Sequence, residues 1–573
     1  MMKRIAAVVR TVCTLLSLCV LPSYAAPQDA DPVVFTLGFS TVDLYYYDGQ
    51  SDTRERVWNL SANGVLELVK ENWQQAAWGL VKAVLFRRYD TLNDAAGKIA
   101  KPVLDKMEKL TKLPDGSDKY DLSVSPAVDK SNIPLSYSKE YRGVYLNGIY
   151  RELRKAYGRV YVFVSDWREG QVTQARQLDE YIQKVKADSG KEQVSLFGFS
   201  QGGETIATYL YYYGDKGDVK KAVMETPAIG GTSFVTAILE GDAFTIHADA
   251  TIAFCEAYME SEKHFEVLGK LLHLRWLRQP ILSIAYTHVL PIARYWGGLW
   301  DLVPCEDYDR LKSQYLDPVA SAPLIADSDA YHYDVVPHLG EKLRALQSDG
   351  MSISVICNTG NPLLFCNEEG DGVLNAENVS GAAVADYGKR FKPCKCTGTT
   401  CGDPAHNHLS PSHTIDASSC YLPENTWFVE GQFHGQCDWD PYTEELMCKL
   451  MMTDDLTDVY SDPAFPQFAF AQSAADRFAV RFDEGGSFIA GKTVTLTNLS
   501  EQHAVRLQSV TMFGSGLTVQ LPRKTVLAPG ESVTLTLSGT AKHGAYAPMH
   551  VHYVYADEQT PLPREKVFKT SVL

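Results

Sequence analysis

A serine within a glycine-rich turn is the residue whose setting most clearly indicates chemistry. Residues 194–203 read Val-Ser-Leu-Phe-Gly-Phe-Ser-Gln-Gly-Gly, so Ser200 stands two residues from Gly198 and from Gly202 in a G-x-S-x-G pattern. An apolar stretch typical of a β-strand precedes the pattern, and a helical pattern follows it. A nucleophilic serine occupies a strained strand-to-helix turn of this kind, where its neighbours must be small. We therefore predict that Ser200 is a nucleophile; the alternative is a glycine-rich turn around a structural serine.

A candidate acid follows a later apolar stretch. In enzymes with this turn, the partners of the serine follow it in the chain in the order acid, then histidine. Asp371 lies between two glycines after the apolar stretch 353–357, so its loop can turn the carboxylate inward. We expect Asp371 to be the acid, with Glu369 as the alternative. An acidic surface turn would leave a similar pattern, whereas a calcium-binding EF-hand loop would need ligand spacing that is absent here.

The candidate base is His434, which directly follows the apolar stretch 427–431. It would take the proton of Ser200 and return it to the leaving alcohol, while Asp371 would hold its tautomer and stabilise the imidazolium. Three other histidines compete for this role, but no strand precedes them in their cysteine-rich stretch: His406, His408 and His413.

Two backbone N–H groups are expected to stabilise the oxyanion that forms during acyl transfer. One belongs to Gln201, at the start of the helix after Ser200, where free N–H groups and a partial positive charge are available. The other belongs to Phe39, in the turn after the apolar stretch 33–37. This chemistry requires neither a metal ion nor an organic cofactor.

The elements that must position these residues alternate between strand and helix from Asp31 to about Tyr460. Such alternation predicts an α/β fold with a mostly parallel sheet, which fits the α/β-hydrolase architecture. Strands are expected at 33–37, 159–164, 193–197, 222–225, 353–357 and 427–431. A cap or lid is expected within about 232–302, where core packing accounts for most of the tryptophan and leucine residues.

From about Phe468 to Leu573 the pattern changes to short alternating strands separated by turns. About seven such strands in roughly 105 residues are typical of an immunoglobulin-like β-sandwich. Two prolines within 461–466 indicate the boundary. We therefore expect a catalytic domain at 27–462 and an accessory sandwich at 467–573, which has no catalytic residues of its own and would bind a surface or a partner.

The first 26 residues resemble a secretory signal peptide. Lys3 and Arg4 precede the apolar stretch 12–21, and small residues place the cleavage site near Ala25-Ala26. The chain would thus be secreted or periplasmic. No stretch is long enough to predict a transmembrane segment. The formal net charge of −16 argues against binding to nucleic acid, because phosphates need basic partners.

Twelve cysteines are present, ten of them beyond the first 26 residues, and eight of these ten fall between positions 357 and 448. A cysteine-rich insertion is expected at about 376–426, where Cys394, Cys396 and Cys401 lie close to three histidines. A zinc site is one interpretation. The spacing matches no standard pair of zinc ligands, and an exported protein meets an oxidising environment, so disulfides are favoured with their pairing left open.

Several blocks in the same order resemble the lecithin:cholesterol acyltransferase family, which includes lysosomal-type phospholipase A2 and phospholipid:diacylglycerol acyltransferases. The resemblance covers roughly residues 31–450. The blocks lie at 32–38, 165–168 (Ser-Asp-Trp-Arg), 226–232, 297–304 and 370–373, together with the Ser200 turn and His434. The chain departs from the family at Leu37, where the family has proline, and at Phe199 in the turn.

The resemblance implies that Ser200, Asp371 and His434 form a catalytic triad, with Phe39 and Gln201 as oxyanion donors. It implies a secreted lipid acyl hydrolase or O-acyltransferase, of the phospholipase A kind, that forms an acyl-enzyme on Ser200. The acyl acceptor would be water or an alcohol such as a sterol or diacylglycerol, and we favour water. The alternatives are a catalytically inactive hydrolase scaffold that serves as an adhesin or lipid-binding protein, and an esterase for a non-lipid ester or a peptidase.

Overall fold

The computed structural model describes most of the chain between residues 31 and 568. The described ranges are 31–58, 101, 104–128, 148–240, 289–363, 368–385, 391, 406, 408–410, 414–435, 440–471, 478–482, 493–498, 504–512, 516–539, 549–556 and 564–568. The expected signal peptide, most of the expected cap and nearly half of the cysteine-rich insertion, including Cys394, Cys396 and Cys401, lie outside the described residues. Those three expectations stay predictions.

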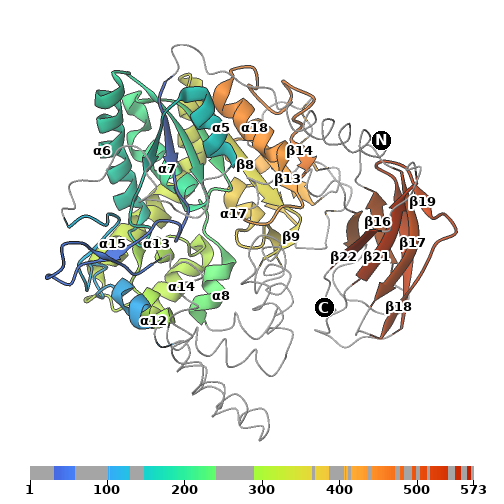
Figure 1. Cartoon of the computed structure of the whole chain (residues 1–573), viewed down its shortest axis with the longest axis horizontal. Helices are drawn as coiled ribbons and strands as arrows, with labels where there is room; N and C mark the ends of the chain where they lie inside the picture. The colour runs from blue at the N-terminus through green and yellow to red at the C-terminus, as the bar shows by residue number, and fades with distance from the viewer. Residues whose placement is uncertain are drawn as a thin grey trace, which may run out of the picture.

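A seven-stranded parallel sheet forms the centre of the molecule (Figure 1). The order of its strands is β14-β13-β8-β7-β6-β1-β5. Their bounds are β1 Val33–Thr36, β5 Val160–Phe163, β6 Val194–Phe199, β7 Val219–Glu225, β8 Ser352–Thr359, β13 Thr426–Glu430 and β14 Phe468–Phe470. The expected α/β fold with a parallel sheet is therefore confirmed. Strands such as β1, Val-Val-Phe-Thr, are apolar throughout because helices cover both faces of the sheet.

Helices pack on both faces and create two separate cores. On one face lie α6 (Gln171–Ser189), α7 (Gln201–Tyr213) and α16 (Val336–Ser348). On the other lie α5 (Gly148–Tyr157) and α18 (Pro441–Met452), which contact each other. Four apolar positions of α6 repeat at three- and four-residue spacing and are buried: Ala175, Leu178, Ile182 and Val185.

Further helices and short strands connect the elements of the parallel sheet. The helices are α8 Ser233–Glu240, α12 Leu290–Ala293, α13 Gly297–Trp300, α14 Cys305–Tyr315, α15 Ala322–Asp329, η6 Ala330–Val335 (a π-helix) and α17 Ala376–Ser380, with the 3₁₀ turns η1 Glu108–Leu110, η3 Gly214–Lys216 and η7 Ala417–Ser419. The short strands are β2 Tyr45–Tyr46, β3 Glu55–Arg56, β4 Leu122–Ser123, β9 Asn361–Pro362, β10 Glu369–Gly370, β11 Ala383–Val384 and β12 Ile415–Asp416. Among the described residues, no helix is both long and apolar enough to cross a lipid bilayer.

The C-terminal part contains two antiparallel sheets of four strands each, drawn in red in Figure 1. Their orders are β15-β16-β20-β18 and β19-β17-β21-β22. The bounds are β15 Phe478–Phe482, β16 Thr493–Asn498, β17 Val505–Met512, β18 Leu517–Gln520, β19 Val526–Leu527, β20 Ser532–Gly539, β21 Met549–Tyr555 and β22 Arg564–Phe568. Both sheets contribute to one hydrophobic core, for example Leu496 and Leu535 from the first and Leu507 and Val551 from the second. This core is distinct from the two that flank the parallel sheet.

The parallel sheet extends slightly beyond the boundary that the sequence suggests. Strand β14 pairs with β13, so residues assigned to the sandwich belong to the sheet instead. Phe465 is buried in the α5–α18 core, and its carbonyl accepts a hydrogen bond from the Trp427 indole at 3.0 Å. The prolines at 463 and 466 therefore lie within the parallel-sheet part, where the sequence pattern alone suggested a domain boundary.

We predict that a chain ending after Ala471 keeps the fold of the parallel-sheet part, whereas a chain ending after Ser461 loses stability. The shorter chain removes the edge strand and Phe465, and loss of a buried phenylalanine typically costs about 3–5 kcal/mol. Urea unfolding of both chains, followed by tryptophan fluorescence, measures the difference. Equal stability of the two chains would show that β14 is dispensable, and unfolding of both would show that the C-terminal sheets are part of the same folding unit.

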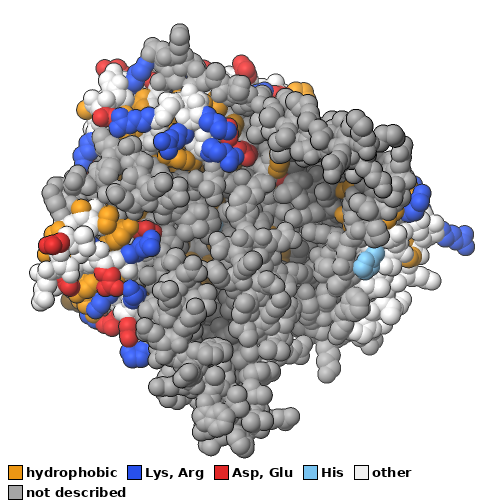
Figure 2. All heavy atoms as spheres, in the orientation of Figure 1, with side chains coloured by type: hydrophobic (Ala, Val, Ile, Leu, Met, Phe, Trp, Pro, Cys, Tyr) orange, Lys and Arg blue, Asp and Glu red, His pale blue; other side chains and the backbone are white. Residues whose placement is uncertain are grey.

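Charged residues on the described part of the surface are mixed in sign. Figure 2 shows basic and acidic side chains side by side on the face it presents. Part of this mixing comes from ion pairs on and beside α5, where Glu152 contacts both Arg151 and Lys155.

Candidate active site

Ser200 occupies the sharp turn between β6 and α7, in a backbone conformation that L-residues rarely adopt. Its φ is 55° and its ψ is −124°. Three backbone hydrogen bonds hold it there: the Ser200 N–H donates to the Glu225 carbonyl at 3.0 Å, and its own carbonyl accepts from the N–H groups of Glu204 (3.1 Å) and Ala228 (3.2 Å). The cost of the strained conformation is thus met by the surrounding chain, as is typical of functional sites.

The two glycines of the turn are required by close packing. A Cβ atom on Gly198 would lie 2.5 Å from Thr36 Oγ1 and 2.7 Å from the Gly202 carbonyl oxygen. One on Gly202 would lie 2.6 Å from the Thr36 carbonyl oxygen. These separations are shorter than any real Cβ contact, so larger residues at either position would displace β1. The turn therefore needs both glycines because β1 runs directly beside it.

His434 lies between Ser200 and Asp371 and hydrogen-bonds to both. Its Nε2 is 3.0 Å from Ser200 Oγ, and its Nδ1 is 2.7 Å from Asp371 Oδ2. An ionised carboxylate can only accept a hydrogen bond, so Nδ1 carries the proton and Nε2 is left to accept the serine hydroxyl. The structure thus brings together three residues that the sequence separates by 171 and 63 positions.

Asp371 is fully buried and firmly held. Its Oδ1 accepts hydrogen bonds from the N–H groups of Val373 (3.0 Å) and Leu374 (2.8 Å), which leaves Oδ2 for His434. The Asp371 carbonyl also accepts from the His434 N–H at 2.7 Å, so the acid loop and the histidine loop are joined by their backbones. The alternative acid, Glu369, instead accepts a hydrogen bond from the Gly360 N–H.

The competing histidines bond elsewhere. His408 is buried, and its Nδ1 lies 2.8 Å from Gln467 Oε1, while His406 pairs with Glu424 at 3.0 Å. His413 lies outside the described residues. Neither described competitor therefore contacts Ser200 in this arrangement, and His434 alone of these three has that contact.

The environment of His434 favours its charged form. Burial by itself would lower the pKa of the imidazole, but the charge of Asp371, its hydrogen bond and the charge of Glu225 outweigh burial and raise the pKa above its usual value. A base must be neutral to accept a proton. The rate of any reaction that needs neutral His434 falls as the pH drops below this pKa, and this fall is the acidic limb of its pH–rate profile. The raised pKa therefore places the acidic limb at higher pH than an ordinary histidine would.

The two residues expected to donate to the oxyanion belong to segments that adjoin Ser200. Gln201 is the first residue of α7, where N–H groups have no acceptor within the helix. Phe39 follows Gly38, and a Cβ on Gly38 would lie 3.2 Å from Ser200 Cβ, so this loop runs directly against the serine. Their role as donors stays a prediction.

Strained backbone gathers at this edge of the sheet. Three non-glycine residues in the described part of the chain have positive φ: Ser40 (62°), Ser200 (55°) and Thr226 (40°). They follow β1, β6 and β7, which are neighbours in the sheet. Such strain concentrates where a fold positions reactive groups.

A small pocket that opens to solvent lies beside these residues. Apolar side chains form most of its wall. Gly38, Phe199 and Gly435 also line it, and they are the sequence neighbours of Phe39, Ser200 and His434. The other lining residues are Phe35, Leu37, Thr41, Ile149, Phe197, Glu225 and Met447. The pocket suits an apolar group attached to a reacting carbonyl at Ser200.

Sequence reasoning missed Glu225, the one acidic residue of this pocket wall. It is fully buried at the end of β7, between the strands that precede Ser200 and Asp371. The signal was present in the sequence as a charged residue that ends an otherwise apolar strand, Ala222 to Met224.

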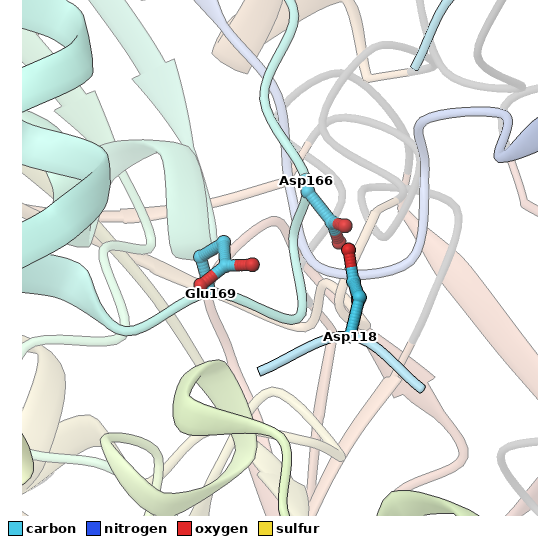
Figure 3. Close-up of side chains that lie close together, drawn as sticks. All are labelled: Asp118, Asp166 and Glu169. Carbon is cyan, nitrogen blue, oxygen red and sulfur yellow. The ribbon is translucent and has the colours of Figure 1, made fainter. Parts of the chain in front are cut away.

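A group of three carboxylates near the oxyanion loop has the geometry of a metal site. Oxygens of Asp118, Asp166 and Glu169 lie within 4.8 Å of one another (Figure 3). Two buried cations already neutralise them: Lys112 contacts Glu169 at 2.5 Å, and Arg168 contacts Asp166 at 2.5 Å and Asp118 at 2.9 Å. The donor set therefore fits an ion-pair network better than a site for a cation.

This network supports, through Trp167, the loop after β1 that carries Phe39. The Trp167 ring packs against the Phe39 ring, with centroids 4.8 Å apart, and its indole N–H donates to the Val42 carbonyl at 3.1 Å. The Trp296 ring also packs against the Trp167 ring, with centroids 5.1 Å apart. The Ser-Asp-Trp-Arg block thus serves to position the loop that carries Phe39.

Three of the described cysteines carry free thiols: Cys305, Cys357 and Cys420. Six of the ten cysteines beyond residue 26 lie outside the described residues, so the expected disulfides stay a prediction. The expected zinc alternative concerns Cys394, Cys396 and Cys401, which also lie outside them.

In comparisons with known proteins, no protein-family model matches the chain, and no curated protein matches it significantly.

Proposed function

We propose that this protein is a serine-dependent ester hydrolase of the α/β-hydrolase type. The observation that carries the proposal is the hydrogen-bonded series from Ser200 through His434 to Asp371, at 3.0 and 2.7 Å. A strained, buried turn and an adjoining apolar pocket accompany the series. This combination of nucleophile, base and orienting acid is the arrangement that activates a serine hydroxyl.

The reaction would proceed through an acyl-enzyme. His434 Nε2 takes the hydroxyl proton as Ser200 Oγ attacks the ester carbonyl, and the oxyanion accepts hydrogen bonds from the N–H groups of Phe39 and Gln201. His434 then gives its proton to the leaving alcohol, and the acyl group remains on Ser200. Water then attacks this ester while His434 takes its proton, the bond between the acyl carbon and Ser200 Oγ breaks, and His434 returns the proton to Oγ as the carboxylic acid departs. Asp371 keeps Nδ1 protonated throughout.

A lipid ester is the substrate class that the pocket favours. An acyl chain attached to the Ser200 ester would meet the apolar wall formed by residues such as Phe35, Ile149 and Met447. The sequence resemblance to the lecithin:cholesterol acyltransferase family points to the same class. We favour water over a sterol or glycerolipid alcohol as the acyl acceptor, and we propose that the protein is exported through its N-terminal segment.

The main alternative is an inactive scaffold that binds a lipid or a surface. It predicts no constraint on the Ser200–His434–Asp371 geometry, yet these groups hydrogen-bond in the order catalysis requires. An esterase for a non-lipid ester shares the same chemistry and differs only in what the pocket accepts.

A fluorophosphonate probe tests this proposal. We expect covalent labelling of Ser200, because the probe phosphonylates only activated serines, with loss of fluoride. Incubation with radiolabelled phosphatidylcholine should then yield free fatty acid. Absence of labelling in folded protein would support the inactive scaffold. Labelling with cleavage of short-chain esters alone would indicate a non-lipid esterase, and transfer of the acyl group to added sterol or diacylglycerol would identify a transferase.

A further inference from the structure

We propose that Glu225 is a positioning residue that acts together with Asp371 to hold the charged form of His434 during the reaction. This inference rests on the proposed function, because it concerns the same histidine. It assigns a second carboxylate to the site, from a strand that the sequence analysis did not connect with chemistry.

Glu225 is built into the turn that carries the nucleophile. It is the last residue of β7, it is fully buried, and its carbonyl accepts the Ser200 N–H at 3.0 Å. The next residue, Thr226, has a positive φ of 40°. The chain therefore turns sharply at the point where the Glu225 side chain leaves β7, so its position depends on the same strained backbone as that of Ser200.

The carboxylate of Glu225 is held by two donors. Oε1 accepts from the Asn358 amide at 2.9 Å, and Oε2 accepts from the Thr226 hydroxyl at 3.1 Å. Asn358 is itself buried, on β8. Hydrogen bonds donated to a carboxylate favour its ionised form, which offsets part of the cost of burying the charge.

Glu225 lines the pocket that lies beside His434. Glu225 lines it together with Phe199 and Gly435, the neighbours in sequence of Ser200 and His434. The Phe199 ring packs on the His434 imidazole with centroids 4.9 Å apart. This apolar cover reduces the screening between the carboxylate and the imidazole, so their attraction is stronger than it would be in water.

The charged and titratable groups around His434 come from several elements. Asp371 faces it from the loop after β10, Glu225 from β7 and the Ser200 hydroxyl from the turn after β6. Behind Asp371, the Cys357 thiol on β8 stays neutral, because burial and then the nearby carboxylates raise its pKa well above the usual value. The two carboxylates are the charges that raise the pKa of His434. When His434 takes the serine proton it becomes a cation, and both carboxylates then stabilise it.

The test is the variant Glu225→Gln, which removes the charge and keeps the shape. The rate constant for fluorophosphonate labelling of Ser200 is measured from pH 4 to pH 9, together with kcat/KM for a soluble ester. Neutral His434 is the reactive form, and losing one anion lowers its pKa. We therefore expect the acidic limb of both profiles to move to lower pH, and the plateau rate to fall by up to about tenfold, the factor that corresponds to one pKa unit.

Glu204→Gln is the matched control. Glu204 is equally buried and also contacts the turn, since its N–H donates to the Ser200 carbonyl. Burial and then the charge of Asp301 raise its pKa well above the usual value, which favours its neutral form. No charge on Glu204 contributes to the pKa of His434, so the acidic limb should stay where it is in the wild type.

The outcomes separate the two proposals. Wild-type protein that is not labelled at any pH overturns the proposed function. Labelled wild type with an unchanged acidic limb in folded Glu225→Gln overturns only the role of Glu225, and so does a slower plateau without movement of the limb. Glu225→Met removes the same charge without adding a buried amide, and it replaces Glu225→Gln if that variant does not fold. Glu225→Asp, which keeps the charge, should return the limb toward its wild-type position.

Discussion

Replacing Ser200 by alanine should abolish ester cleavage and leave the protein folded. Loss of a triad nucleophile typically lowers kcat by about 10⁶-fold, because the acyl-enzyme can no longer form. The fold should persist, since the hydrogen bonds that hold the turn are made by the Ser200 backbone and not by its hydroxyl. Hydrolysis of a p-nitrophenyl ester measures the activity, and circular dichroism during heating measures the fold.

Ser195→Ala is the matched control for this variant. Ser195 lies on the same strand, β6, and is also buried, but it is five residues before the turn. We expect this protein to keep nearly full activity. If Ser200→Ala retained turnover close to that of Ser195→Ala, Ser200 would not be the nucleophile, whatever its position beside His434.

Replacing Asp371 by asparagine should lower kcat by about 10⁴-fold, the loss seen when the acid of a triad is neutralised. The asparagine amide can donate to Nδ1, which would force the proton onto Nε2 and leave no acceptor for the Ser200 hydroxyl. The acidic limb should also move to lower pH, because the charge of Asp371 helps to raise the pKa of His434. Steady-state kinetics across pH on a soluble ester measures both effects.

Glu369→Gln serves as the comparison for Asp371→Asn. Glu369 is the other acid that the sequence allows, and it lies two residues away in the same loop. Its carboxylate accepts the Gly360 N–H, so a modest effect on stability and a far smaller effect on kcat are expected. A larger loss of activity in Glu369→Gln than in Asp371→Asn would exchange the roles of the two residues.

The identity of the base shows how far sequence reasoning reaches. The apolar stretch before His434 predicts a strand, and a residue directly after a parallel strand reaches the edge where the other strands end. This argument needs only the local pattern and the order of the elements. It favours His434 over His406 and His408, which the structure places against Glu424 and Gln467, respectively.

The choice between Asp371 and Glu369 depends on tertiary structure. Both residues occupy one acidic loop, and the glycines on either side of Asp371 favour it, but the contact of either carboxylate with the histidine depends on packing. The N–H groups of Val373 and Leu374 hold one oxygen of Asp371, and the backbone bond from His434 to Asp371 brings the two loops together. The contacts between His434 and Asp371 join segments 63 residues apart, so no local pattern encodes them.

By itself, the sequence determined the elements of this protein: the strands of the parallel sheet, the turn at Ser200 with its two glycines, and the later acid and histidine. Each follows from short-range periodicity or from a steric need at one position. Only the tertiary structure decided that β14 completes the sheet and that Glu225 enters the pocket beside His434. The physical reason is that strand order and side-chain burial depend on which distant segments pack together, and a buried charge such as that of Glu225 becomes informative only when its neighbours are known.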